Sequence, residues 1–163
     1  YFVSPKTLFA PPTNKIDSAS KQILADMEER VDELNRNNRL VEANRLYERI
    51  THDVEMMREV GYCSGMENYS CYFSDRDPAS PPITLLDYLP KDGLLFVDES
   101  HVMVPQISAM YRGDQARKET LIDYGFRLPS SKNNRPLNFG EFEKVKPQTI
   151  FVSATPGDYE LKV

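Results

Sequence analysis

Residues 93–97 read GLLFV and residues 149–152 read TIFV, and these two short apolar runs decide the fold. Neither run alternates apolar with polar side chains, and continuous apolarity is typical of strands that are covered on both faces. Polar residues follow each run at once and mark the carboxyl end of each predicted strand. Such strands belong to mostly parallel sheets whose connections are helices. The two runs therefore predict an α/β fold with a mostly parallel sheet.

Three helices are predicted between these strands, at residues 104–111, 115–124 and 139–144. Asp114 is the expected N-cap of the second helix, and Gly125 is its expected stop. Asn138 precedes the third helix, and Asn138 and Glu141 have the spacing of a capping box, in which each side chain accepts from the backbone N–H of the other residue. A parallel pair of strands needs a helical crossover of this kind.

An amphipathic pattern precedes the strands. Apolar residues recur at spacings of three, four and seven over residues 16–34 and over residues 40–60, with a short polar break between the two runs. Gly61 is a natural stop for the second run. Between Ser20 and Glu59 there are seven basic and ten acidic side chains, which is typical of a solvated face. The sequence predicts an antiparallel helical hairpin.

The chain divides into three predicted segments, residues 1–15, 16–74 and 75–163. The first is proline-rich and is expected to be a connector that returns from a preceding partner-binding domain. The second is the helical hairpin subdomain, and the third is the α/β part, entered through a proline-rich loop. Because the chain starts at Tyr1 and stops at Val163 just after a Pro-Gly turn, we expect a piece of a longer protein.

Composition limits the classes of function. The 163 residues are 40% hydrophobic and 28% charged, which suits a packed domain rather than a disordered chain. The formal net charge of −5 argues against a non-specific nucleic-acid coat. A local basic region is nevertheless present, because Met110 to Lys146 contain eight basic and five acidic side chains.

Two further features bear on location. No apolar stretch approaches the roughly 20 residues of a membrane helix, so no membrane association is expected. Cys63 and Cys71 are the two cysteines, too few for a disulfide framework and without zinc-ligand spacing. Reduced thiols in a cytoplasm are the expected state.

The acids after the first strand suggest nucleotide chemistry. Ligands of open α/β sheets collect beyond the carboxyl ends of the strands, where Asp98 and Glu99 stand. In nucleoside triphosphatases one carboxylate at such a place holds hydrated Mg²⁺ and another orients or deprotonates the attacking water. Two acids after a strand also cap helices, so the pair alone leaves both interpretations open.

Residues 98–101, DESH, resemble motif II of superfamily 2 helicase motors, and residues 153–156, SATP, resemble their motif III. Longer strings resemble one family specifically, and they lie at 61–70 (GYCSGMENYS), 84–88 (TLLDY), 98–102 (DESHV), 110–114 (MYRGD), 124–130 (YGFRLPS), 134–137 (NRPL) and 152–157 (VSATPG). Over residues 19–161 the chain is similar to the UvrB family, the helicase-like component of excinuclease ABC.

The resemblance implies a partial RecA-like (P-loop NTPase) fold, with part of the first motor domain in residues 75–163 beside the helical subdomain. By the same resemblance, Asp98 binds Mg²⁺ through water, Glu99 is the general base, and His101 helps to couple hydrolysis to movement. The residues that would link the nucleotide site to DNA handling are Ser153, Ala154 and Thr155.

Four further residues resemble positions that line the DNA path or support strand opening in this family: Arg49, Glu67, Phe126 and Arg127. The residues themselves give moderate support, because Phe126 offers a stacking ring beside the phosphate-seeking guanidinium of Arg127. From the residues alone, a core Phe126 and a surface ion pair of Arg127 stay open. Cys71 and Tyr72 stand where the family commonly has Arg-His, so a basic contact is expected to be missing there.

The function that the resemblance implies is damage verification in bacterial nucleotide excision repair, with ATP-dependent DNA binding and local strand opening. ATP and Mg²⁺ would be its ligands, and damaged DNA, UvrA and UvrC its partners. No string matches the phosphate-binding pattern G-x-x-x-x-G-K-S/T. We therefore expect these residues alone neither to bind ATP well nor to hydrolyse it. The alternative is a noncatalytic protein-interaction module of a helicase-related repair factor, with the acids as relics.

Overall fold

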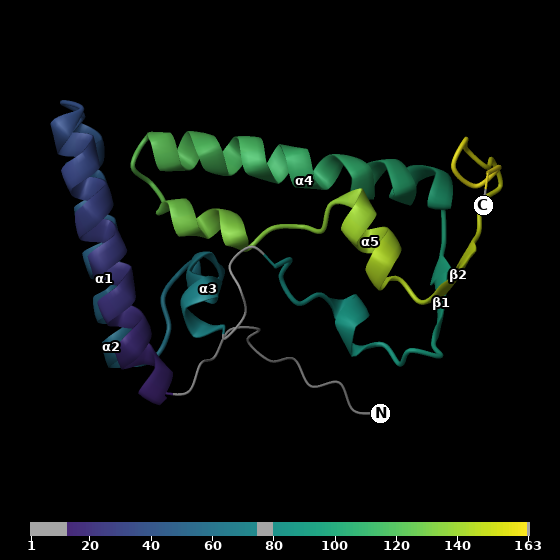
Figure 1. Ribbon diagram of the computed structural model, residues 1–163, viewed down its shortest axis with the longest axis horizontal. Coiled ribbons are helices and arrows are strands. Elements are labelled where there is room, and N and C mark those ends of the chain that lie inside the picture. Colours follow the sequence, from purple (N-terminus) through teal and green to yellow (C-terminus); the bar gives the residue numbers. More distant parts are fainter. Residues whose placement is uncertain (1–12, 75–79, 163) are drawn as a thin grey trace. The chain divides into compact units, whose positions relative to one another are not determined.

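The computed structural model describes residues 13–74 and 80–162, which are mostly helical with one small parallel sheet (Figure 1). Two compact units are present. The helical unit consists of the described residues up to Ser80 together with Arg117–Asn134, and the strand unit of Pro81–Ala116 together with the described residues from Arg135 onward. Most of the predicted connector, residues 1–12, and residues 75–79 of the predicted loop lie outside the described residues. No described helix has the length and apolarity to cross a bilayer.

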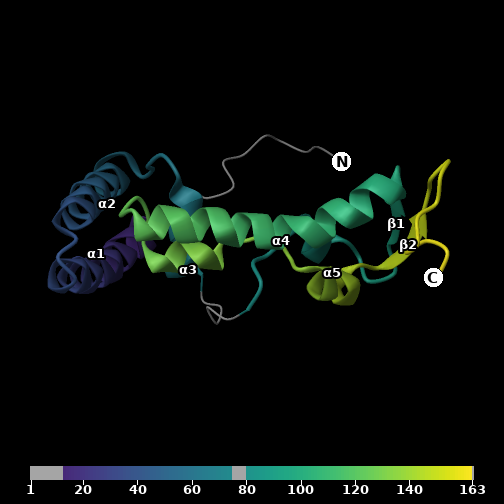
Figure 2. The same ribbon diagram turned by 90° about the horizontal axis from the view of Figure 1, so that it is seen from above.

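The predicted helical hairpin is confirmed. Helix α1 spans Thr13–Arg36 and α2 spans Leu40–Val60, and the two lie side by side in both views (Figures 1 and 2). Asn38 turns the chain between them with a left-handed φ of 58°. Gly61 ends α2 as predicted: its N–H makes the last helical bond, to Met57 O at 3.0 Å, and its left-handed backbone (φ 80°) turns the chain away from the helix.

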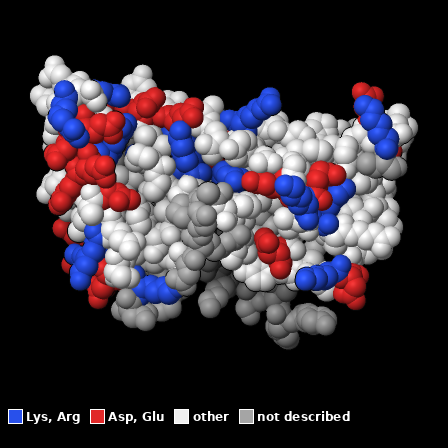
Figure 3. Space-filling model, viewed as in Figure 1, with Lys and Arg blue, Asp and Glu red and all other residues white. Residues whose placement is uncertain are grey.

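The apolar stripes of α1 and α2 form the core of the helical unit. Ile23 and Met27 from α1 and Leu46 and Met57 from α2 are buried, as the periodicity predicts. Three short elements also belong to this unit: η1 (Met66–Tyr69), α3 (Ser70–Phe73) and η3 (Pro129–Asn133). Charged side chains of both signs gather over the hairpin at the left of Figure 3, in line with a solvated face.

Helix α4 corrects the prediction of two helices in residues 104–124. It runs without a break over Ser100–Asp123, through Pro105 and Gly113. An internal glycine weakens a helix by only about 1 kcal/mol relative to alanine. Val104 and Ile122, near the two ends of α4, are both buried. Asp114 is therefore inside a helix rather than an N-cap.

Gly125 ends the helical run as predicted, and it also permits a close approach. Its φ is +72°, and a Cβ at this position would clash with the backbone of Glu42 in α2. Gly125 is thus required both for its left-handed backbone and for its small size.

We expect Gly125→Ala to lower the free energy of unfolding by about 2 kcal/mol, of which about half is left-handed strain and the rest the clash. Gly61→Ala is the matched control, because the backbone of Gly61 is also left-handed but no atom lies within 4 Å of an added Cβ. It should lose about 1 kcal/mol, from strain alone. Amide hydrogen exchange of α2 in the full-length protein measures both. Equal losses would contradict the close approach.

The strand unit contains the predicted parallel pair. Strand β1 (Leu94–Val97) pairs in parallel with β2 (Gln148–Phe151), with Phe96 opposite Ile150. Helix α5 (Phe139–Val145) begins at Asn138, whose side chain forms the predicted capping box with Glu141. The short helix η2 covers Leu85–Tyr88.

The expectation that both strands are covered on both faces is wrong for this structure. Phe96 is 62% exposed and Ile150 is 42% exposed, whereas Val97 on the opposite face is buried. The apolar runs thus face solvent on alternate residues, because among the described residues the sheet has two strands and one of its faces is open.

Candidate functional site

Motif II forms the turn between β1 and α4. Asp98 Oδ1 accepts a hydrogen bond from the backbone N–H of Glu99 at 2.9 Å, and α4 begins at the next residue. Glu99 has a left-handed φ of 47°, which costs a residue with a side chain about 1–2 kcal/mol. Backbone strain of this kind clusters at functional sites. Both carboxylates are exposed, and the Glu99 side chain retains 67% of its accessible surface.

Motif III lies next to motif II because the parallel ladder continues past both strands. Val152 N donates to Val97 O at 2.9 Å, and Ser100 N donates to Val152 O at 3.0 Å. This ladder places Ser153 beside the first turn of α4. The carboxyl ends of two parallel strands meet at one edge of a sheet, so the sequence could predict this meeting.

His101 joins the two motifs. Its Nδ1 lies 2.8 Å from Ser153 Oγ and 3.4 Å from Glu99 Oε2. Ser153 Oγ also accepts from the backbone N–H of Thr155 at 3.1 Å. Ala154, between them, is exposed. One serine and one imidazole thus lie between the motif III loop and the Glu99 carboxylate.

The segment after motif III contributes contacts that the sequence did not reveal. Glu160 Oε2 accepts from Gly157 N at 3.1 Å, and the neighbouring Ser100 side chain holds the pKa of Glu160 below its ordinary value. Tyr159 donates to Glu143 Oε1 at 2.7 Å. Glu160 thus closes the turn that follows motif III.

Asp98 fits a magnesium ion that keeps most of its water. Mg²⁺ in nucleotide sites is held by one or two carboxylates together with water and substrate phosphates. Asp98 supplies one exposed carboxylate at the end of a strand. The described residues contain no cluster of three or more His, Cys, Asp or Glu side chains that could hold a metal, so they offer no protein cage.

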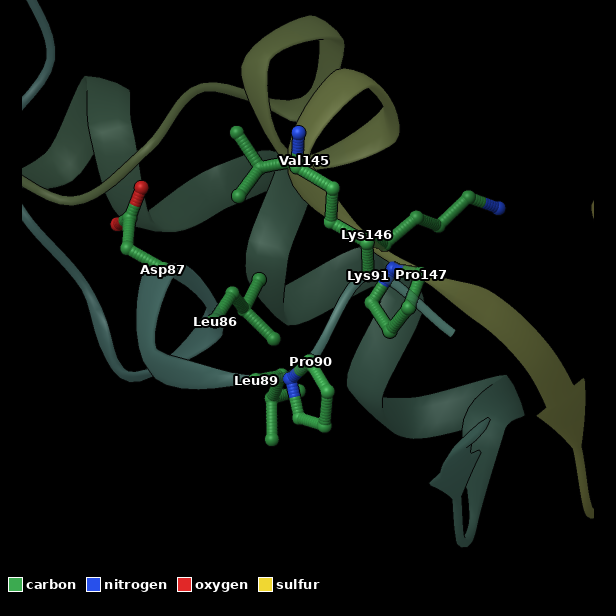
Figure 4. Close-up of a pocket in the computed structure, with 8 residues that line it drawn as sticks. All are labelled: Leu86, Asp87, Leu89, Pro90, Lys91, Val145, Lys146 and Pro147. Atoms are coloured by element: carbon green, nitrogen blue, oxygen red, sulfur yellow. The ribbon is translucent and has the colours of Figure 1, made fainter. Parts of the chain in front are cut away.

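The strand unit also has a hollow away from these motifs (Figure 4). It has a volume of about 280 Å³ and lies between residues 86–91 and 145–147. Its lining is partly apolar and partly charged, from Leu86, Leu89, Pro90, Val145 and Pro147 together with Asp87, Lys91 and Lys146. None of the residues of motif II or motif III lines it. It therefore takes no part in the candidate site.

The four residues predicted to handle DNA all belong to the helical unit. Three of them reach the loop before η1. Arg49 Nη2 donates to Ser64 O at 3.2 Å. Glu67 and Arg127 have side-chain atoms 3.9 and 3.7 Å from where a Cβ on Gly65 would lie. Phe126 is 44% exposed, which rules out the core position that the residues alone had left open.

Arg49 also makes an ion pair that the sequence did not indicate. Its Nε donates to Asp53 Oδ2 at 2.9 Å, and Tyr69 donates to the same oxygen at 2.7 Å. Asp53 is only 3% exposed. Burial, and then the hydrogen bond to Asp53, raise the pKa of Tyr69, so its hydroxyl remains a donor at neutral pH. One sequence signal could have predicted this ion pair, namely an acid on the apolar face of α2, four residues after an arginine.

Comparison with known proteins finds relatives of this chain. Residues 14–75 match the family described as UvrB third helical domain. Over 160 residues, 98% of the chain, it is 59% identical to the UvrABC system protein B of Coxiella burnetii. The chain belongs to the UvrB family.

Other relatives have the same name and a similar identity. The UvrABC system protein B of Vibrio parahaemolyticus is 57% identical over 162 residues, 99% of the chain, and that of Salmonella heidelberg is 58% identical over the same length. The chain spans 24% of the length of each of these relatives. Because the similarity to UvrB extends over nearly the whole chain, it includes motif II, motif III and the helical unit.

Proposed function

We propose that the chain is part of a protein that verifies DNA damage in bacterial nucleotide excision repair, through ATP-dependent DNA binding and local strand opening. The similarity to UvrABC system protein B supports this function. The observation that carries it is the contact of His101 with Ser153, because it connects the two motifs that a DNA-dependent ATPase must couple. UvrA, UvrC and damaged DNA are the proposed partners, and the cytoplasm is the proposed location.

In this proposal the strand unit is part of a RecA-like motor domain. Asp98 would hold Mg²⁺ through water, and Mg²⁺ would neutralise charge on the phosphates of ATP. The Glu99 carboxylate would accept the proton of the attacking water. His101, in contact with Ser153, would couple a change in the position or protonation of Glu99 to the motif III loop. The phosphate-binding loop would come from another part of the full-length protein.

We expect Ser153→Ala to uncouple hydrolysis from DNA in the full-length protein. The substitution removes the acceptor of Thr155 N and the contact of His101, but it leaves Asp98 and Glu99 in place. Stimulation of ATP hydrolysis by damaged duplex should fall about tenfold, the equivalent of one lost hydrogen bond. Hydrolysis without DNA should change little.

Ser108→Ala is the matched control for this experiment. Ser108 lies on α4 rather than in the motif III loop, and its hydroxyl donates to Val104 O of its own helix at 3.1 Å. It should leave both rates unchanged. A Ser153→Ala protein with full stimulation would contradict the coupling role, and a wild-type protein without DNA-stimulated hydrolysis would contradict the proposed function.

A further inference from the structure

The beginning of α2 holds the end of α4 through two arginines. The Arg39 guanidinium donates to Asp123 O, and Arg45 Nη1 donates to Tyr124 O at 2.7 Å. These carbonyls stand at the carboxyl end of a helix, where negative partial charge attracts a cation. The two contacts fix the backbone that leads into Phe126.

Arg45 makes a second contact from the same guanidinium. Its Cζ lies 4.4 Å from the centroid of the Phe126 ring. A guanidinium that bonds Tyr124 O and covers one side of the Phe126 ring restrains that ring in one orientation. The ring is nevertheless 44% exposed. Phe126 therefore presents aromatic surface to solvent from a fixed position.

The neighbourhood of the ring has the composition that single-stranded nucleic acid requires. Tyr124 is 56% exposed and adds a second aromatic ring beside Phe126 in the chain. Arg127 follows directly. The nearby carboxylate of Glu42 is paired with Arg39 at 3.0 Å, so its negative charge is largely balanced. Exposed aromatic rings bind bases by stacking, and the cationic side chains around them bind phosphates by charge.

We propose that Tyr124, Phe126 and Arg45 form a stacking surface for single-stranded nucleic acid, in which Arg45 is a positioning residue for the Phe126 ring. This inference rests on the proposed DNA-handling function and extends it to Arg45 and Tyr124. A base stacks on the open side of Phe126 while Arg45 supports the other side. Strand opening exposes unpaired bases, which are the form of DNA that such a surface accepts.

The experiment measures the affinity of the full-length protein for a fluorescein-labelled oligothymidylate by fluorescence anisotropy. Phe126→Ala should weaken binding about tenfold or more, the loss expected for one base stack. Arg45→Ala should weaken binding through the same ring, so the double variant should bind no worse than Phe126→Ala alone. Arg45→Lys should behave like Arg45→Ala, because an ammonium group keeps the charge but lacks the planar face.

Arg58→Ala is the control, since it removes one exposed positive charge from the same helix. It should change the affinity less than about twofold. Arg45→Lys with wild-type affinity, or losses that multiply in the double variant, would overturn the positioning role. Binding that both Phe126→Ala and Arg45→Ala leave intact would overturn this inference alone. A wild-type protein that neither binds DNA nor hydrolyses ATP would overturn the proposed function instead. Unchanged amide exchange in α2 confirms that each variant is folded.

Discussion

Replacing Arg49 by methionine is expected to lower the free energy of unfolding of the helical unit by about 3 kcal/mol. The methionine keeps most of the aliphatic volume but removes both guanidinium contacts. Asp53, buried and held also by Tyr69, then keeps a single hydrogen bond for its charge. An unpaired buried carboxylate is much less stable than a paired one, so the loss exceeds that of an exposed ion pair.

Amide hydrogen exchange of the peptides that cover α2, measured on the full-length protein, tests this expectation. Arg49→Met should accelerate exchange there by about a hundredfold, the equivalent of 3 kcal/mol. Arg58→Met is the matched control, because Arg58 is exposed near the end of the same helix. Equal exchange in the two variants would show that the pair of Arg49 with the buried Asp53 is not important for stability. Because Arg49 also stabilises the fold, a loss of DNA binding in an Arg49 variant has to be compared with the loss of stability measured here.

The helical hairpin and the parallel strands could be predicted because their signals are local. Apolar spacing of three and four places Ile23 and Leu46 on buried faces, and continuous apolar runs mark β1 and β2. Capping chemistry is equally local. Gly61 and Asn138 end and begin helices where their residue types indicate.

Other features depend on contacts between distant residues, and the sequence did not reveal them. Helix α4 continues through Gly113 and Asp114, although a glycine followed by an aspartate is typical of a helix boundary. The close approach of Gly125 to Glu42 joins residues far apart in the chain. Exposure of Phe96 depends on what covers the sheet, which the strand's own composition does not specify.

The features of the candidate site likewise divide into those that local sequence signals predict and those that depend on contacts between distant residues. Motif II and motif III could be expected to meet because each follows a strand of one parallel pair. The individual contact of His101 with Ser153, and the left-handed backbone of Glu99, required the structure. Arg45 had no sequence signal, because an arginine on a solvated helix face is common. Its partner Phe126 lies about 80 residues further along the chain.

Glu99→Gln is the second large expected effect. The amide keeps the shape of the side chain and removes the carboxylate that we propose accepts a proton from the attacking water. Loss of a general base slows hydrolysis by about a hundredfold or more. Binding of ATP should persist, because Asp98 and the rest of the turn are unchanged. Glu119→Gln makes the same chemical change at an exposed surface pair with Lys132 and should have no effect.

The most direct test of the central claim compares ATP hydrolysis by the wild-type and Glu99→Gln full-length proteins. Damaged duplex and UvrA are present in both reactions, and ATP binding is measured for each protein. A loss of about a hundredfold or more in hydrolysis, with binding retained, is the predicted result and identifies Glu99 as the catalytic carboxylate of a DNA-dependent motor. Unchanged hydrolysis would contradict it, because Glu99 would then be structural and a noncatalytic interaction module would be the better description of the chain.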